Sequence, residues 1–340
     1  ALHLRLIESR RPVEVVRISF AGHNTARALE EIGLATRLVT EVAQGHFDNT
    51  AFCRDYRRGR HASCLFWYGL AEYLAERGRR GWALAAITLA AHLMLSGARM
   101  RDLTLQRDIL DLAIELSGEA RLGDLTRRWV EAFEPNAPPR LLAKARAWAS
   151  LATGRFRDAL EQVRELQRLG AHEEDYPVVI AVLDASNRHQ KAEAILARAA
   201  SSDFAPLLCA AGASYLENGG AEAALPLLMK AAARDPRSAE IRILLAATHL
   251  ALGDEAHARR ALGGAGGMIP ASPEVAKKLV AVTTVLDGEA AAQAVQARID
   301  RMRAGQTALE AGLDSIDPAA LGEGVRALLL KVSGRGRQPD

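Results

Sequence analysis

The sequence predicts an all-α protein that is built from repeated pairs of antiparallel helices. The first reason is composition: 49% of the residues are hydrophobic, mostly Ala and Leu, and only 5% are aromatic. Ala and Leu are strong helix formers, and Ala is small enough to let two helices approach closely. The second reason is a pattern of small residues, glycines and prolines that recurs after 34 residues. A regular repeat of this length is typical of stacked helix pairs.

Two copies of the repeat are clearest, between Ala205 and Pro270. A small residue on each helix of a pair lets the two helix axes cross closely. A glycine between the two helices favours the positive φ of a tight turn, and a proline stops the second helix. The matching positions are, in the first copy, Leu208, Ala211, Gly212, Tyr215, Gly219, Ala224, Leu228, Ala231 and Pro236 and, in the second copy, Arg242, Leu245, Ala246, His249, Gly253, Ala258, Leu262, Ala265 and Pro270.

This spacing resembles the tetratricopeptide repeat, in which a pair of helices with small residues at the crossing is followed by a proline. The resemblance covers roughly residues 30–304, with looser copies at 67–90, 139–171, 180–199 and 279–299. It implies a TPR-like α-solenoid, which is a right-handed superhelix of antiparallel helix pairs. The aromatic residue that the family usually has on the second helix is replaced by Leu228, Leu262 and Ile87.

The chain is expected to divide into five segments. Val13–Phe20 alternates apolar and polar side chains for part of its length, and a lone strand, an extended arm and the start of a helix all stay open for it. A proline-rich break at Glu134–Pro139 is expected either to bend the solenoid or to divide it into two halves. The expected segments are an N-terminal arm or strand-like segment at 1–23, N-terminal helical repeats at 24–134, C-terminal TPR-like repeats at 140–304, a capping helix at 305–333 and a disordered tail at 334–340.

The charge pattern does not predict a nucleic-acid partner. The net charge of +3 is small for 340 residues, whereas a nucleic-acid binder needs a clustered basic face. Basic residues gather in three places, which we interpret as solvated helix ends and loops; an acidic or phosphate-rich partner is the alternative. These residues are Arg54, Arg57, Arg58 and Arg60, then Arg77, Arg79 and Arg80, and in the tail Lys331, Arg335 and Arg337.

Residues Gly81–Ala98 are almost free of charge and resemble a short membrane span. We expect a buried repeat helix there instead, because the stretch contains His92 and falls where the repeat places a helix. No signal peptide is visible, so we expect a cytoplasmic protein, or a periplasmic one if a signal sequence preceded Ala1. The three cysteines do not form a disulfide framework, and a bridge between Cys53 and Cys64 is an alternative only for an exported protein.

No sequence motif for catalysis or cofactor binding is present, so we do not expect an enzyme. The chain has no phosphate-binding loop, no nucleophile elbow and no HExxH motif. The glycine-rich run Gly263–Gly267 is interpreted as a turn between repeats. Paired carboxylates at Glu30–Glu31 and Glu173–Asp175 lie in polar stretches, and we expect them to be solvated.

Four potential zinc ligands gather near the beginning of the chain, at His46, Cys53, His61 and Cys64. Zinc favours nitrogen and sulfur ligands, but no CxxC pair is present and the spacing is not that of a zinc finger. We therefore expect a buried cysteine with surface histidines, and no metal.

The resemblance also implies that the first helices line a concave groove. Family members that clamp a peptide carboxylate use Lys, Arg and Asn there, whereas this chain has only Lys144. Other positions where a clamp residue would be expected are occupied by Val178, Pro206 and Ala210. We expect no such clamp, and instead an apolar groove for an amphipathic helix, an extended segment or a helix of the protein itself. Trp148 is one of two aromatic residues expected to anchor a partner, with core packing as the alternative. The expected groove residues are Tyr68, Glu72, Lys144, Trp148, Cys209, Ala213, Leu216, Ile243, Ala247 and Leu250, of which Tyr68 is the other anchor.

These observations favour a scaffold that binds a protein or peptide partner without a cofactor. The Ala- and Arg-rich composition suggests a bacterial multiprotein assembly for secretion, polysaccharide export or complex maturation. The alternative is the sensory or regulatory part of a larger transcriptional or signalling regulator. Repeat surfaces also self-associate, so a homo-oligomer is a further alternative.

Overall fold

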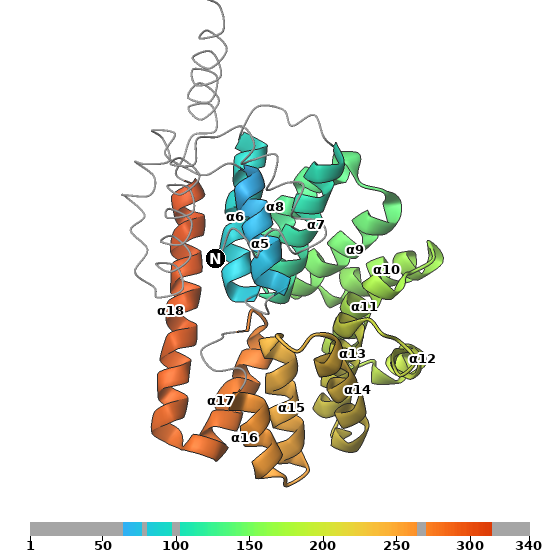
Figure 1. The fold of residues 1–340 in the computed structure, drawn as a ribbon. Coiled ribbons are helices and arrows are strands. Elements are labelled where there is room, and N and C mark those ends of the chain that lie inside the picture. The colour runs from blue at the N-terminus through green and yellow to red at the C-terminus, as the bar shows by residue number, and fades with distance from the viewer. Residues whose placement is uncertain (1–63, 77–79, 97–102, 264–269, 315–340) are drawn as a thin grey trace, which may run out of the picture. The chain divides into compact units, whose positions relative to one another are not determined.

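The computed structural model describes residues 64–76, 80–96, 103–263 and 270–314. All regular elements in these ranges are helices, and no strand occurs among them, so the predicted all-α class is confirmed (Figure 1). The arm or strand-like segment at 1–23, the repeats before residue 64, the tail at 334–340 and the capping helix beyond residue 314 lie outside the described residues.

The helices keep the labels of Figure 1. Fourteen α-helices are described, with two short 3-10 turns at Glu134–Asn136 and Glu173–Asp175. The bounds are α5 Cys64–Glu76, α6 Arg80–Ser96, α7 Leu103–Glu119, α8 Gly123–Phe133, α9 Pro139–Ala152, α10 Phe156–Arg168, α11 Tyr176–Ala185, α12 His189–Ala199, α13 Ala205–Glu217, α14 Ala221–Arg234, α15 Ala239–Ala251, α16 Glu255–Gly263, α17 Pro273–Asp287 and α18 Glu289–Asp314.

The chain forms two compact units. Of the described residues, unit 1 contains 64–74, 82–96, 103–109 and 300–314, and unit 2 contains 75–76, 80–81, 110–263 and 270–299. The proline-rich stretch does not separate the units, because α8 and α9 on either side of it both belong to unit 2 and contact one another. Pro139 begins α9, where its missing N–H costs no helical hydrogen bond. The division of the repeats at 134–140 stays a prediction from the sequence.

The helix pairs of unit 2 are closed by tight turns with a residue of positive φ. Gly219, between α13 and α14, has a φ of 78°, and Gly253, between α15 and α16, has a φ of 77°. Asn187 takes the same position between α11 and α12 with a φ of 53°. Asparagine is one of the few residues besides glycine that populate this region readily. The turns that the sequence predicted are therefore confirmed.

The predicted helix crossings are also present in unit 2. A Cβ atom placed on Gly212 would lie 2.5 Å from Cγ of Leu228, so α13 and α14 touch where α13 has no side chain. One repeat later, Ala246 and Ala258 are fully buried, and they form a core cluster with two apolar residues of α17. Small residues thus set the spacing of both pairs, as their sequence positions indicated.

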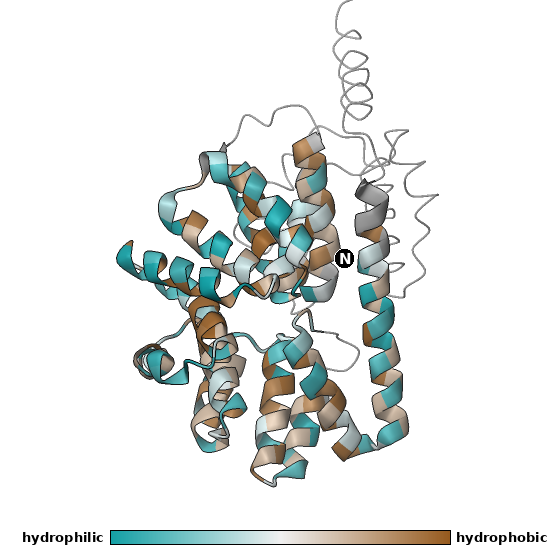
Figure 2. Ribbon diagram, turned by 180° about the vertical axis from the view of Figure 1, so that it is seen from behind, coloured by the Kyte–Doolittle hydropathy of each residue, from teal (hydrophilic) through white to brown (hydrophobic). Residues whose placement is uncertain are grey.

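First and second helices of the pairs differ in burial. The second helix α10 buries only Ala159, Val163 and Leu166, and the rest of its surface is largely charged. The first helix α11 buries most of its residues, from Tyr176 to Leu183. In Figure 2, α10 is accordingly hydrophilic along much of its length and α11 hydrophobic. The first helices therefore lie inside unit 2, and the second helices lie toward solvent.

Unit 1 contains most of the nearly uncharged stretch Gly81–Ala98. Its described residues, 81–96, lie on α6, where Ala83, Ile87 and Ala90 are fully buried at the positions that the repeat predicted. Nowhere in the described ranges does a helix have both the length and the hydropathy that crossing a bilayer requires.

The last helix among the described residues crosses a boundary that we predicted from the sequence. We placed a boundary between the repeats and a capping helix at 304/305, but α18 continues without interruption to Asp314. Ile299, Met302, Gln306 and Leu309 are buried at helical spacing across this point, so there is no reason for the helix to end. In unit 1, the amide of Gln306 donates to Thr88 Oγ1 at 3.4 Å.

We predict that Gly212→Ala destabilises the protein by about 1–3 kcal/mol, because the new methyl group overlaps Leu228. Urea unfolding measures the change. Gly263→Ala is the control, since a Cβ there meets no atom within 4 Å. Adding Leu228→Ala to Gly212→Ala should recover part of the loss of Gly212→Ala. Equal stability of Gly212→Ala and the wild type would contradict the crossing.

Candidate functional site

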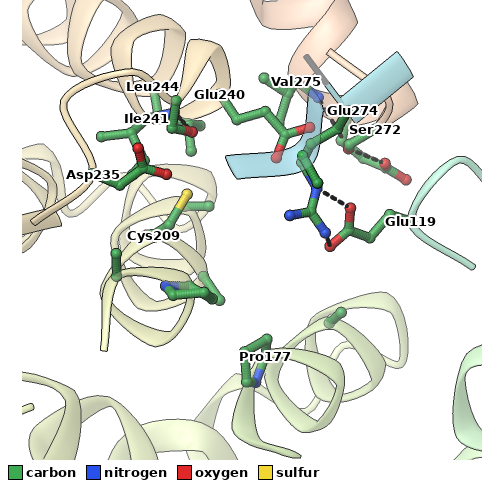
Figure 3. Close-up of a pocket in the computed structure, with 18 of the residues that line it drawn as sticks. Glu119, Pro177, Cys209, Asp235, Glu240, Ile241, Leu244, Ser272, Glu274 and Val275 are labelled. Carbon is green, nitrogen blue, oxygen red and sulfur yellow. Dashed lines mark hydrogen bonds and ion pairs between the residues drawn. The ribbon is translucent and has the colours of Figure 1, made fainter. Parts of the chain in front are cut away.

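Unit 2 contains a cavity of about 190 Å³ that is lined by first helices of successive pairs (Figure 3). Trp148 of α9, Pro177 of α11, Cys209 of α13, Ile241 of α15 and Val275 of α17 all contribute to its wall. Among the described residues, none from the second helices α10, α12, α14 and α16 lines it. The cavity therefore occupies the position where the repeat resemblance implied a groove.

Small and apolar side chains form one wall of the cavity. Pro177 and Ala181 belong to α11, and Pro206, Ala210 and Ala213 belong to α13. Proline in the first turn of a helix costs no hydrogen bond, so α11 and α13 can each place a rigid apolar residue at their beginning. The short side chains leave the space that larger residues would fill.

Charged side chains form the opposite wall, and the sequence analysis missed them. In Figure 3, Asp235, Glu240 and Glu274 lie across the cavity from Pro177. Glu119, from the end of α7, lies near Glu274. The predicted apolar groove is therefore corrected: it is apolar on one side and rich in carboxylates on the other. The repeat was identified from apolar and small residues, and carboxylates are not part of that pattern, so it did not predict them.

A sequence signal for two of these carboxylates existed. Glu240 and Glu274 occupy the same slot, the second residue of α15 and α17, in repeats 34 residues apart. Pro206 occupies this slot one repeat earlier. Because residues at one slot of successive repeats face the same way, the recurrence of Glu could have predicted an acidic surface.

Arg80 holds two of the carboxylates in unit 2. Its Nε donates to Glu119 at 2.8 Å and its Nη2 donates to the other oxygen of Glu119 at 2.7 Å, a bidentate pair. The same Nη2 donates to Glu115 at 2.7 Å. We had interpreted Arg80 as a solvated residue of a basic loop, and the structure corrects this, because only 19% of its side chain is exposed. A sequence pattern cannot reveal this, since the partners lie 35 and 39 residues away.

The carboxylates around Arg80 outnumber its single charge. Burial raises the pKa of Glu119 to about 8, and the negative charges of Glu240 and Glu115 add to this against the attraction of Arg80. Burial also acts to raise the pKa of Glu115, but the charges of Arg80 and Lys144 outweigh it and the pKa is lowered. Glu119 is thus the group in this cluster that holds a proton near neutral pH.

Arg121 places a second cation at the cavity with an uncommon backbone conformation. Its φ is 59°, in the left-handed region, at the turn that follows α7. The Arg121 N–H donates to the Gly118 carbonyl at 3.1 Å, and that of Leu122 donates to the Ser117 carbonyl at 3.0 Å. Glycine usually occupies such a helix end, because a side chain costs about 1 kcal/mol there. The turn directs Nε of Arg121 to within 3.2 Å of Glu274 Oε1.

Three residues lining the cavity each leave a buried polar atom without a partner among the described residues. These atoms are Nε1 of Trp148, Nη1 of Arg121 and Oε1 of Glu240. An unpaired buried polar atom costs roughly 1–3 kcal/mol, so such atoms are few in native proteins. These atoms are themselves buried, so a ligand in the cavity could pair with them only if the side chains rotated.

The thiol of Cys209 also lines the cavity, but it is not a nucleophile at neutral pH. Burial raises its pKa, and the negative charges of Glu240 and Glu119 raise it further. A cysteine acts as a nucleophile through its thiolate. Cys209 therefore contributes a small apolar surface to the cavity.

The expected groove residues are only partly brought together. Trp148, Cys209 and Ala213 line the cavity. Trp148 is just 6% exposed, so it is largely a core residue, packed against Gly118 of α7. Leu216 on the same helix as Cys209 is half-buried and is not among the lining residues.

The other expected groove residues have different roles in the structure. Lys144 is buried, with its ammonium 3.6 Å from Asp111 and 4.0 Å from Glu115. Burial acts to lower the pKa of Lys144, but Asp111 and Glu115 outweigh it and the pKa is raised. Ile243 is fully buried in α15.

Ala247 and Leu250 pack against the cluster formed by Ala246, Ala258 and two residues of α17. In unit 1, Tyr68 is buried and donates to Glu72 at 2.7 Å. Neither pair of residues lines the cavity.

One carboxylate that we expected to be solvated is buried. Asp175 has no exposed surface, and Oδ2 accepts from Arg140 Nη1 at 2.5 Å and from the backbone N–H of His172 at 2.8 Å. The sequence around Asp175 is polar, but the 3-10 turn that begins at Glu173 directs its side chain inward to a basic partner on α9.

Potential metal ligands meet at the turn between α15 and α16. One ligand atom from each of His249, Asp254 and His257 lies within 4.8 Å of the others, and the two rings stack with centroids 5.1 Å apart. However, Asp254 accepts from the His257 backbone at 3.0 Å and lies 2.6 Å from His257 Nδ1. Asp254 is thus the N-cap of α16, and we assign the cluster a structural role.

Of the zinc ligands considered in the sequence, His46, Cys53 and His61 lie outside the described residues. Cys64 is half-buried, and its Sγ donates to the Ala90 carbonyl at 3.2 Å. Burial of the sulfur raises the pKa of the Cys64 thiol to about 12.

We predict that Glu119 makes stability depend on pH. Its folded-state pKa of about 8 lies above the ordinary value of 4.5, so the folded state binds the proton more tightly. The contribution is fully present below about pH 4.5 and is lost as the pH rises through about 8. In urea unfolding at pH 5.5 and 8.5, the wild type should lose more stability than Glu119→Gln, which cannot titrate. Glu222→Gln, on the exposed face of α14, should behave as the wild type; equal loss in all three would contradict the assignment.

The comparison with protein families agrees with the repeat geometry. The tetratricopeptide repeat model matches residues 215–282, which extend from the end of α13 into α17. No curated protein sequence matches the chain. Residues 215–282 thus match the tetratricopeptide repeat family, as the 34-residue spacing predicted.

Proposed function

We propose that this chain is a protein–protein interaction scaffold that binds an extended segment of a partner in the cavity of unit 2. A tetratricopeptide repeat supports a role in protein–protein interaction in general. The observation that carries the finer proposal is the composition of the cavity, whose apolar wall faces polar groups that lack partners. An apolar cavity with a few convergent polar groups is the usual form of a binding site.

The size of the cavity favours a short extended segment. Its volume of about 190 Å³ is below the roughly 300–1,000 Å³ of pockets that enclose a drug-sized ligand. A helix has a diameter of about 10–12 Å, so it is too wide for the cavity. A helix also pairs its own backbone groups, so they cannot bond to the unpaired polar atoms of the lining. An extended segment inserts single side chains, and its free carbonyls can accept from Trp148 Nε1 and Arg121 Nη1. Of the occupants considered from the sequence, the extended segment is therefore favoured over an amphipathic helix.

We further propose a binding and not a catalytic role, within a bacterial multiprotein assembly for secretion, polysaccharide export or complex maturation. The protonated thiol of Cys209 supports binding, since this group is not activated as a nucleophile. The bacterial setting rests on the Ala- and Arg-rich composition alone.

The experiment is a selection of peptides from a phage-displayed library of random linear peptides. The wild type is compared with Ala210→Trp, which fills the cavity from α13, and with Ala223→Trp, on the exposed face of α14. We expect selected peptides to bind Ala210→Trp at least about tenfold more weakly in fluorescence anisotropy, a difference of roughly 1.4 kcal/mol. Binding to Ala223→Trp should equal that of the wild type. Peptides that bind all three proteins equally would refute the cavity as the site.

We predict that Arg121→Gly separates binding from stability. The change removes a left-handed side chain, which favours folding by about 1 kcal/mol, and an ion pair worth about 0–1 kcal/mol. Urea unfolding should therefore show that Arg121→Gly is as stable as the wild type or more stable. The selected peptides should bind it about tenfold more weakly, because the guanidinium donor is lost. Asn187→Gly is the matched control, because it also replaces a residue of positive φ but one remote from the cavity lining. Unchanged peptide binding by Arg121→Gly would exclude its guanidinium from the site.

A further inference from the structure

We propose that the partner segment inserts a lysine or arginine side chain, with an apolar residue beside it, between the carboxylates and the apolar wall of this cavity. The inference rests on the proposed function and names the chemistry of the segment. It is the opposite of a carboxylate clamp, in which the groove supplies cations to an anionic peptide end.

The distribution of charges supports a cationic ligand. Two arginines and four carboxylates line the cavity. Arg80 is held by Glu119 and by Glu115 behind it, and Arg121 is paired with Glu274 at 3.2 Å. In the described part of the chain, no cation is paired with Glu240 or Asp235. Because Glu119 holds a proton, the three other carboxylates of the lining face two arginines, and three negative charges against two positive ones leave the lining with one net negative charge.

The second observation is the state of the polar atoms around these carboxylates. Oε1 of Glu240 is buried and unpaired, although a buried carboxylate oxygen is costly without a donor. Trp148, which is less than a tenth exposed, leaves its indole N–H without an acceptor at the same cavity. A peptide with a basic side chain supplies both partners, its ammonium or guanidinium to Glu240 and a main-chain carbonyl to Trp148.

Apolar side chains on both sides of the cavity suit the rest of such a segment. Ile241 and Leu244 lie beside Asp235 and Glu240 on the same side of the cavity, and Pro177 lies opposite. Lysine and arginine have long methylene stems that pack on apolar surface while their charged ends reach a carboxylate. Pro206 and Ala210 leave room for an apolar neighbour of the basic residue. An acidic segment would meet Glu240 and Asp235 without compensation, so the cavity selects against it.

The test uses the peptides selected on the wild type and the variants Glu240→Gln and Asp235→Asn. We expect the peptides to be enriched in a Lys or Arg next to an apolar residue, relative to the unselected library. Replacing that basic residue with Gln should weaken binding about tenfold in the wild type and about twofold in Glu240→Gln, so that the two changes are coupled. Glu222→Gln is the control and should keep the full tenfold effect, because Glu222 is exposed on α14 and does not line the cavity.

The outcomes separate this inference from the proposed function. Peptides that lose affinity for Ala210→Trp but show no basic enrichment, or no coupling to Glu240, would overturn the inference and leave segment binding intact. Peptides that bind Ala210→Trp as tightly as they bind the wild type would refute both the inference and the proposed function. If spermidine at equal concentration displaces the peptides, a free polyamine is sufficient to occupy the cavity. This result would overturn the proposal that the occupant is a peptide segment.

The chain itself contains a competing basic segment, with Lys331, Arg335 and Arg337. A full-length variant with all three changed to Gln tests this segment as the occupant. The proposal expects the selected peptides to bind the variant and the wild type equally. If the peptides bind the variant about tenfold more tightly, the protein's own basic segment occupies the cavity. This result would overturn the proposal that a partner segment does.

Discussion

The close crossing of two helices at a small residue is the constraint on which unit 2 depends. At Gly212 the side chain of Leu228 occupies the place of a Cβ, and at Ala246 the same crossing is made with Ala258. A close crossing fixes the register of each pair, because neither helix can slide without overlap. Successive pairs then stack with their first helices in the same orientation. The residues at the beginnings of α11, α13, α15 and α17 consequently converge on one cavity.

The cavity combines two requirements that usually oppose one another. Its apolar wall of proline and alanine offers no partner to a charge, whereas its other wall brings carboxylates together at a cost in electrostatic free energy. Arg80 offsets part of this cost by pairing with Glu119 and Glu115, and Glu119 offsets more by holding a proton. The left-handed turn at Arg121 is a further local cost. Such costs gather where a protein is arranged for binding, and this supports the cavity over any other described surface.

A part of the site could have been predicted from the sequence, and a part could not. Trp148, Cys209 and Ala213 were found because first-helix positions follow from the repeat. Glu240 and Glu274 could have been predicted, since they occupy equivalent positions in two repeats that are 34 residues apart. Lys144 and Ile243 were assigned to the groove by register, but their side chains are buried within unit 2. A register gives the approximate face of a helix, and a residue at the edge of that face points either into the groove or into the core.

The sequence by itself determined the helical class, the turns at Gly219 and Gly253, and the crossings at Gly212 and Ala246. Each of these depends on the backbone freedom or the size of a residue at a fixed spacing, which is a local property. Only the tertiary structure decided that Arg80 pairs with Glu119, that Asp175 is buried on Arg140 and that carboxylates gather opposite Pro177. These contacts join residues from different helix pairs. Their formation depends on the direction of each side chain and on how the pairs stack, and no periodic pattern along the chain encodes either.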